Sequence, residues 1–325
     1  MKFSGEILLL VLLVLAAQTA FTALYPVPPV SNIVHEMQAS YRHSFVFLGD
    51  SVNATYSKAD ARRKSISWLL EQKIDQRVAD ISRGGFDMLL FRGYIRELVR
   101  QPPKPRTVLV EVNLSNFSDD GRSFFTQHQE IIFNLQGQTR WWLRVLDRPL
   151  HIFQFPCVRP AIRREEYMNR DIVWQGRVIG KQKNFESDHF MVPVVTDDLV
   201  RDNLIIRYGI PLHECNRMLE ATTEAARLLR THGQRAVFFI TPVNYQRGEA
   251  YWNNAISPIL QAKAARVRAA IAAGGGECID LSFALDKTFF DTSRYPNEHL
   301  TESGRDFVAQ SLADCCLTAT KVDDP

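Results

Sequence analysis

The stretch HSFVFLGDSVN, residues 43–53, places an uninterrupted apolar run directly before a glycine, an acid and a hydroxyl. A short, continuous apolar run predicts a strand that is buried on both faces of a sheet. Gly49, Asp50 and Ser51 are common turn residues, so an ordinary loop would explain them. They would equally suit a nucleophile at the carboxyl end of a central strand, where open α/β sheets place their ligands.

Apolar strands alternate with helical segments on both sides of this stretch. Strands are expected at residues 44–48, 74–81, 107–117, 235–244 and 277–282. Helices are expected at about 58–72, 86–99, 215–229 and 252–273, and after Thr301, which is a suitable N-cap. This alternation predicts an α/β fold, a three-layer α/β/α sandwich with a parallel sheet covered on both faces.

One region breaks the alternation. Residues from about 124 to 200 contain aromatic and polar stretches without the strand and helix pattern. We interpret them as an insertion over the carboxyl edge of the sheet, in the position of a lid or substrate platform. The predicted organisation is a segment 1–30 and a catalytic domain 31–320 that carries this insertion.

The N-terminal segment has a different character from the rest. The run from Ile7 to Leu24 is uncharged, apolar and about as long as a helix that crosses a bilayer. Lys2 precedes it and no basic residue follows until Arg42, a bias that places the bulk of the chain outside the cytoplasm. We favour an uncleaved transmembrane anchor, followed by a Pro-rich linker. A cleaved signal peptide is the alternative, because small residues lie near the end of the run.

The composition excludes several classes of protein. The chain has 325 residues and a net charge of +3, with no basic run interleaved with aromatic residues, so nucleic acid is not an expected partner. Five cysteines without CxxC spacing argue against a zinc site, and the histidines form no metal-ligand pattern. We therefore expect neither a metal nor a cofactor.

Four stretches carry the residues that acyl-transfer chemistry needs. Such a site requires a nucleophile, a base and donors for an oxyanion. Ser51 would be the nucleophile, and His299 in NEHLTESG the general base. Gly85 (or Gly84) in ISRGGF offers a backbone N–H, and Asn113 in VEVNLSN offers a side-chain amide. All lie at or after predicted strand ends, which a parallel sheet gathers at one edge.

These stretches together resemble the SGNH/GDSL hydrolase superfamily. FLGDSVN resembles its first block, DISRGG the second, VEVNLSNF the third and EHLTESGRDFVAQSLA the last. The resemblance implies a flavodoxin-like sheet, with Ser51 as nucleophile and His299 as base. It also implies an oxyanion hole made by the N–H groups of Ser51 and Gly85 and by the amide of Asn113.

Two departures from the family pattern leave alternatives open. Glu111 stands where the third block has Gly, and Leu114 where it has Asp, so Asn116 rivals Asn113 as donor. In the last block Pro296 replaces the acid that usually lies three residues before the histidine. The orienting acid is then Asp291, which we favour, or Glu298; without either, serine and histidine would form a dyad.

The apolar N-terminus, NLSNF and TPVN look most like one branch of the superfamily. It comprises bacterial envelope proteins such as alginate O-acetyltransferases and the D-alanine transfer protein of teichoic acid synthesis. This resemblance implies transfer of an acyl group, most simply acetyl, to or from an envelope carbohydrate in the periplasm, with a membrane-bound O-acyltransferase as partner. The alternatives are a plain extracytoplasmic esterase or lipase, and a catalytically silent scaffold that docks a membrane acyltransferase.

Overall fold

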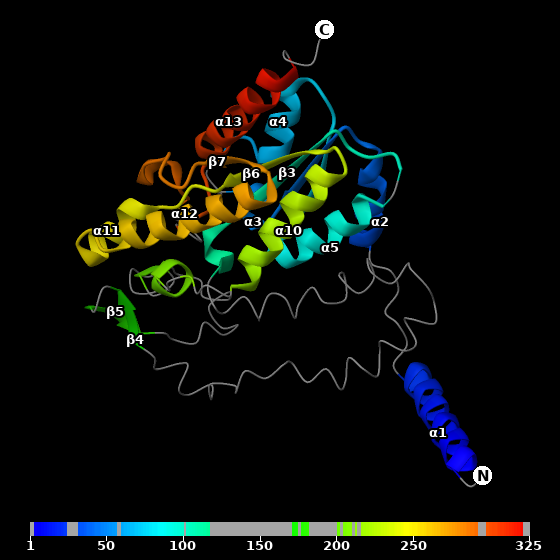
Figure 1. Ribbon diagram of the computed structural model, residues 1–325. Coiled ribbons are helices and arrows are strands. Elements are labelled where there is room, and N and C mark those ends of the chain that lie inside the picture. Colours follow the sequence, from blue (N-terminus) through cyan, green and yellow to red (C-terminus); the bar gives the residue numbers. More distant parts are fainter. Residues whose placement is uncertain are drawn as a thin grey trace.

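The centre of the molecule is a five-stranded parallel sheet (Figure 1). The computed structural model describes residues 3–24, 32–56, 60–100, 102–117, 171–174, 177–181, 200–201, 204–209, 212, 216–291 and 297–320. The strands of the sheet are β1 (Phe45–Gly49), β2 (Val78–Ser82), β3 (Thr107–Val112), β6 (Arg235–Ile240) and β7 (Glu277–Asp280). Their order is β2-β1-β3-β6-β7, and each neighbouring pair is parallel. The predicted parallel sheet is thus confirmed.

Helices cover both faces of the sheet. One face packs against α2 (Asn32–Ala39), η1 (Ser40–Arg42), α5 (Met88–Leu98), α10 (Arg217–Thr231) and α12 (Ile256–Gly274). The other packs against α4 (Ile66–Ile74) and α13 (Glu302–Thr320). Alternate strand residues enter the two cores, because successive side chains of a strand point to opposite faces: in β1, Val46 and Leu48 enter one core, while Phe45 and Phe47 enter the other. The predicted three layers are present (Figure 1).

Shorter elements complete the described chain. They are α3 (Ser51–Ala54), η2 (Leu114–Phe117), the π-helical turn η4 (Ile205–Gly209), α11 (Tyr245–Trp252) and η5 (Lys287–Phe289). A separate antiparallel pair joins β4 (Asp171–Trp174) and β5 (Arg177–Lys181). The rest of the predicted insertion at about 124–200 lies almost entirely outside the described residues, so its lid role stays a prediction.

Several predicted boundaries were wrong for local reasons. The strand expected at 74–81 begins only at Val78, because Ile74 still belongs to α4 and Asp75 ends that helix in the left-handed region at φ 52°. The helix expected at 252–273 corresponds to α12, but it begins only at Ile256, and a separate helix, α11, ends at Trp252. Between them lie Asn253 and Asn254, both with positive φ, a conformation that asparagine tolerates better than most residues.

The strand order determines where a site can form. β1 lies between β2 and β3, so the chain leaves β1 toward one edge of the sheet and later continues on the other side of it. In an open α/β sheet, ligands bind outside the carboxyl ends of the strands at such a switch point. The residue after β1 is Asp50, and the residue after β3 is Asn113. Both therefore lie at the expected crevice.

Gly49, the last residue of β1, has no room for a side chain. A Cβ atom there would lie 2.6 Å from Ser82 Oγ, 2.7 Å from Glu111 Oε2 and 2.8 Å from an atom of the Phe47 ring. Glu111 on β3 projects to this face of the sheet and fills the space that the glycine leaves. The glycine is therefore required by close packing at the strand end.

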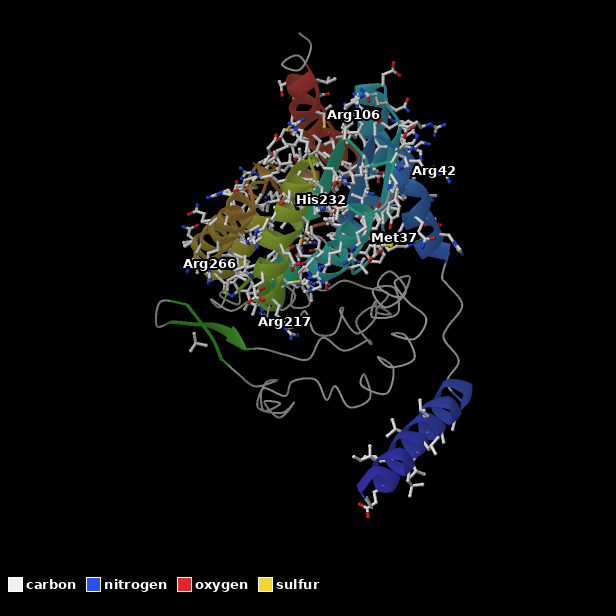
Figure 2. All side chains as sticks on the ribbon, turned by 45° about the vertical axis from the view of Figure 1, so that its right-hand side comes forward. Met37, Arg42, Arg106, Arg217, His232 and Arg266 are labelled. Carbon is white, nitrogen blue, oxygen red and sulfur yellow. The ribbon has the colours of Figure 1, made fainter. Side chains whose placement is uncertain are left out.

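The N-terminal segment forms the helix α1 (Phe3–Leu24). The sticks on α1 in Figure 2 are nearly all carbon. Several of its apolar side chains are more than half exposed: Ile7, Leu9, Leu10, Leu12, Leu13, Val14 and Leu15. Among the residues that the structure describes, no helix has both the length and the hydropathy of a membrane span. The predicted Pro-rich linker, residues 25–30, lies outside the described residues.

Candidate active site

Ser51 and His299 meet at the carboxyl edge of the sheet. Ser51 is the first residue of α3, and Asp50 caps this helix by accepting a hydrogen bond from the Val52 N–H at 2.7 Å. His299 Nε2 lies 3.3 Å from Ser51 Oγ, although 248 residues separate the two in sequence. A serine hydroxyl within hydrogen-bond reach of an imidazole is the arrangement that general-base activation requires.

A network of polar side chains around the buried Asn53 fixes α3 against β2. Asn53 donates to Ser82 Oγ at 2.9 Å and to the Asp80 carboxylate at 3.0 and 3.1 Å. Its side-chain oxygen accepts from the N–H of Ser67, the second residue of α4. Because a helix of four residues has little stability of its own, these bonds hold the backbone that carries Ser51.

The predicted oxyanion glycines form a turn beside Ser51. The N–H of Phe86 donates to the carbonyl oxygen of Arg83 at 3.1 Å, and Gly85 has φ 79°. A positive φ at the third residue is typical of a type II turn and favours glycine there. Gly84 is the residue that faces the nucleophile, since a Cβ on it would lie 3.9 Å from Ser51 Cβ.

Both candidate amides are already engaged. Asn113 Nδ2 donates to Asp50 Oδ2 at 2.9 Å and to Glu298 Oε2 at 3.1 Å. Asn116 Nδ2 donates to the Phe86 carbonyl at 3.2 Å and to Asp50 Oδ2 at 3.4 Å. An amide nitrogen has two hydrogens, so either residue must exchange a present partner to donate to an oxyanion. Asn113 nonetheless links Asp50, the residue before Ser51, to Glu298, the residue before His299.

Glu298 is held by groups other than the adjacent imidazole. Arg207 Nη1 donates to its Oε1 at 2.8 Å, and the Tyr208 hydroxyl donates to its Oε2 at 2.7 Å. Burial alone would raise the pKa of Glu298, but the Arg207 charge and the hydrogen bonds from Tyr208 and Asn113 oppose it, and the pKa is lowered. Glu298 is therefore a buried carboxylate paired with Arg207.

Asp291 reaches His299 through the backbone. Its N–H donates to the His299 carbonyl at 2.8 Å, and a β-bridge joins the neighbouring residues Phe290 and Leu300. The Asp291 side chain is 4% exposed, and its charge is among those that favour a protonated His299. The structure thus brings both candidate acids beside the histidine, with Glu298 already committed to other donors.

His299 is a base surrounded by acids. Burial lowers the pKa of its imidazole, and the Arg207 charge lowers it further, while Glu298, Asp50 and Asp291 oppose the shift. The net shift is downward, so the ring is neutral at neutral pH. A neutral imidazole can accept the Ser51 proton.

Glu111 lies beneath this cluster as a third buried acid. Burial, followed by the Asp50 charge, raises the pKa of Glu111 well above its ordinary value. No ion pair to Glu111 occurs among the residues that the structure describes, and an unpaired carboxylate in such a place would be costly. Burial therefore favours the protonated, neutral form of Glu111, which stands at the position where the SGNH pattern has glycine.

The loop after β6 also joins the site. The N–H of Asn244, in the TPVN stretch, donates to the Asn297 carbonyl at 2.9 Å, two residues before His299. The Asn244 side chain caps α11 by accepting from the Arg247 N–H. Loops after β1, β2, β3 and β6 therefore converge here, as a parallel sheet dictates.

Sequence reasoning did not single out Arg207, Tyr208 or Asn53. Arg207 and Tyr208 follow a region that has no strand or helix pattern. No neighbouring motif therefore indicated that they would lie at the edge of the sheet. Asn53 lies in the opening stretch, and its distance of two residues from Ser51 was a usable signal. Among the described residues, no cluster of His, Cys, Asp and Glu has the geometry of a metal site.

Comparison with known proteins gives weak similarities. No family profile matches the chain, and no curated protein matches its sequence. Among solved structures, LAE5, an alpha/beta hydrolase enzyme from the metagenome of Lake Arreo, aligns with 11% identity and a TM-score of 0.40, covering 86% of this chain and 97% of LAE5. A catalytic mutant of Axe2, an acetylxylan esterase from Geobacillus stearothermophilus, aligns with 10% identity and a TM-score of 0.41, covering 85% and 94% of the two chains. Similarity at this level assigns neither a family nor an activity.

The surroundings of His299 predict the pH dependence of any ester cleavage. We expect kcat/KM to fall as the pH drops through the pKa of His299, with a midpoint below the ordinary histidine value of about 6.5. Glu298→Gln removes the charge that most raises this pKa and should move the midpoint to lower pH. The measurement is kcat/KM against pH with a neutral ester. Glu224→Gln, which alters a carboxylate paired with Arg92 and Arg96, is the control and should leave the midpoint unchanged.

Glu111→Gln tests the buried neutral acid. A raised folded-state pKa means that the folded protein keeps a proton that the unfolded chain releases above about pH 4.3. The contribution of Glu111 to the stability of the wild type is therefore complete below about pH 4.3 and falls as the pH rises toward the folded-state pKa. Gln has the same shape and does not titrate, so urea unfolding should show the variant gaining stability relative to wild type from pH 5 to pH 8. A parallel pH dependence of the two proteins would contradict the assignment, and Glu36→Gln at an exposed acid serves as control.

Proposed function

We propose that the protein carries out serine-dependent acyl transfer or ester hydrolysis through an acyl-Ser51 intermediate. The observation that carries this proposal is the 3.3 Å separation of Ser51 Oγ and His299 Nε2 at the switch point of the sheet. The buried, neutral imidazole and the glycine turn beside Ser51 support the same chemistry.

The proposed reaction follows from the positions of these groups. His299 Nε2 takes the proton of Ser51, and Ser51 Oγ attacks the carbonyl carbon of an ester. The N–H groups of Ser51 and of the Gly84–Gly85 turn stabilise the oxyanion, and Asn113 joins them if substrate displaces one of its carboxylate partners. The imidazolium returns its proton to the departing alcohol, which leaves the acyl group on Ser51. Water or a second alcohol then attacks this acyl-enzyme, with His299 again as base.

We assign the orienting acid to Asp291. Its backbone is paired with that of His299, its carboxyl is buried, and its charge favours the imidazolium that forms during the reaction. The two carboxylate oxygens of Glu298, the alternative, already accept hydrogen bonds from Arg207, Tyr208 and Asn113. In a serine–histidine–acid triad the acid fixes the ring and stabilises its charged form.

Ser51→Ala is the decisive variant. Loss of the nucleophile should lower kcat for a p-nitrophenyl ester by about 10³-fold or more, as in other serine enzymes, and should abolish labelling by a fluorophosphonate. The measurement is steady-state kinetics together with mass spectrometry of the labelled peptide. Ser65→Ala, at a serine that caps α4, is the matched control and should keep both activity and label. Equal activity of Ser51→Ala and wild type would refute the mechanism.

The same labelling separates an enzyme from a catalytically silent scaffold, because a scaffold should not react at Ser51.

Hydrolase and transferase differ only in how well an alcohol competes with water for the acyl-enzyme. Adding an oligosaccharide acceptor to the assay separates them, since acylated sugar forms only by transfer. We propose acetyl transfer to an envelope carbohydrate, on the resemblance of NLSNF and TPVN to that branch of the superfamily.

We further propose that α1 directs the chain to the bacterial envelope, with a membrane-bound O-acyltransferase as the partner that supplies acyl groups. The exposed apolar side chains of α1 and the charge bias around it support this location. Removing residues 1–24 should shift the protein from the envelope fraction to the cytosol. Fractionation and immunoblotting measure the shift, and an unchanged distribution would contradict the proposal.

A further inference from the structure

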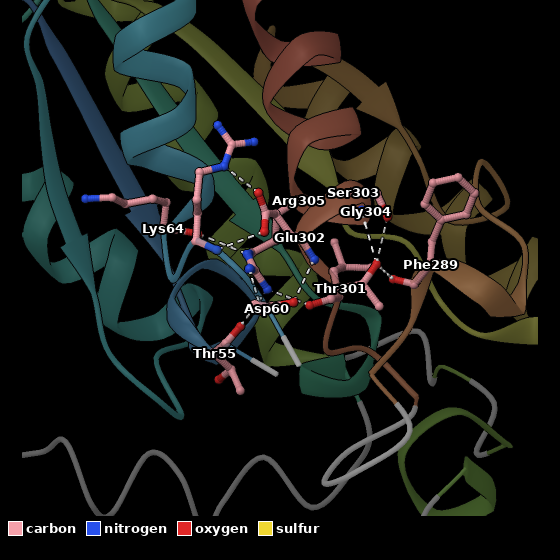
Figure 3. Close-up of polar contacts among 11 residues, drawn as sticks. Thr55, Asp60, Lys64, Phe289, Thr301, Glu302, Ser303, Gly304 and Arg305 are labelled. Atoms are coloured by element: carbon pink, nitrogen blue, oxygen red, sulfur yellow. Dashed lines mark hydrogen bonds and ion pairs between the residues drawn. The ribbon is translucent and has the colours of Figure 1, made fainter. Parts of the chain in front are cut away.

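Arg305 is a fully buried arginine that lies outside the catalytic groups. Its side chain is 0% exposed, and it occupies the first turn of α13, six residues after His299. Arg is rarely buried unless its charge is paired. Its partner is Asp60, whose carboxylate accepts from Nη2 at 2.7 Å and whose side chain is 4% exposed (Figure 3).

The guanidinium joins the two backbone segments that carry the reacting groups. Nη1 donates to the carbonyl of Leu300, the residue after His299, and to the carbonyl of Thr55 at 2.6 and 3.2 Å respectively. Thr55 caps the end of α3, and its own N–H donates to the Ser51 carbonyl at 2.9 Å. One planar group thus connects the helix of the nucleophile to the neighbour of the base.

Further bonds fix the orientation of the guanidinium. Nε donates to the Lys64 carbonyl at 3.0 Å, just before α4. Asp60 also accepts from the Glu302 N–H at 3.1 Å, and Glu302 pairs with Arg62 at 2.6 Å. Figure 3 shows Thr55, Asp60 and Lys64 gathered around Arg305 at the start of α13. Arginine suits this role because its five N–H donors lie in a rigid plane, which an ammonium group lacks.

We propose that Arg305 is a positioning residue that sets the Ser51–His299 separation by hydrogen-bonding the backbone on both sides of the pair. This inference rests on the proposed function, since it assigns Ser51 and His299 as the reacting groups. Arg305 touches neither of their side chains. Its effect is geometric. It fixes the position of the Thr55 carbonyl relative to the Leu300 carbonyl.

Arg305→Lys is the test, because lysine keeps the charge beside Asp60 but cannot span both carbonyls in one plane. We expect kcat for a p-nitrophenyl ester to fall about 10- to 100-fold, since small misplacements of reacting groups have effects of this size, while KM stays within about twofold of wild type. Arg235→Lys is the matched control. Arg235 also pairs with a carboxylate, Glu277, and a carbonyl of α13, at the opposite end of the sheet. Equal losses of kcat in both variants, or none in Arg305→Lys, would overturn the proposal.

A spectroscopic readout keeps the test independent of activity. In ¹⁵N-histidine-labelled protein, Ser51→Ala should perturb the His299 ring nitrogens, identified by their loss in His299→Gln. In the Arg305→Lys background, Ser51→Ala should change the chemical shifts of the His299 ring nitrogens by less than half as much, because Ser51 and His299 are no longer held together. An undiminished perturbation would overturn the proposal even if the wild type cleaved no ester, whereas inactivity of the wild type alone would refute only the proposed function.

A second variant covers the case in which Arg305→Lys does not fold. Asp60→Asn leaves the guanidinium in place with a weaker partner. In this background, Ser51→Ala should perturb the His299 ring nitrogens less than it does in the wild type, but more than in the Arg305→Lys background. An unchanged perturbation in Asp60→Asn would then count against Arg305.

Discussion

The candidate site depends on holding a neutral imidazole among buried carboxyl groups. Asp50, Asp291 and Glu298 are each nearly inaccessible and lie around His299, with Glu111 next to Asp50. Charges of one sign cannot be buried together without donors or protons. Arg207, Tyr208 and the two asparagines supply donors, and Glu111 keeps its proton. This electrostatic demand therefore explains the polar residues around Ser51 first, and the catalytic roles proposed for them build on it.

The topology explains why the donors come from so many parts of the chain. Because the strands are parallel, every strand delivers its following loop to the same edge, and the loops after β1 and β3 become neighbours at the switch point. Asp50 and Asn113 thereby meet within hydrogen-bond distance across 63 residues of sequence. An antiparallel sheet with the same strands would send half of these loops to the opposite edge.

The sequence was sufficient for features that depend on local pattern. Continuous apolar runs predicted the five strands, and the residues directly after them predicted where Ser51 and the glycine turn would lie. It could not give contacts that depend on distant packing. Asn113 was predicted as an oxyanion donor, and nothing in VEVNLSN indicates that its amide also donates to Asp50 and Glu298. Glu111 was recognised only as a departure from a motif, since its raised pKa follows from burial against Gly49 on another strand.

The short helix α3 shows how the fold compensates for weak local structure. Four residues cannot sustain a helix in water, yet Ser51 must hold one position to within a fraction of an ångström to react. The structure restrains α3 at its start through the Asp50 cap, in its middle through Asn53, and at its end through the Thr55 carbonyl. The first two restraints come from the sheet and its adjoining loops, whereas the third comes from the helix that follows His299. The third restraint therefore links the backbone that follows Ser51 to the backbone beside His299, as the bonds of Asn113 to Asp50 and Glu298 do on the side chains that precede them.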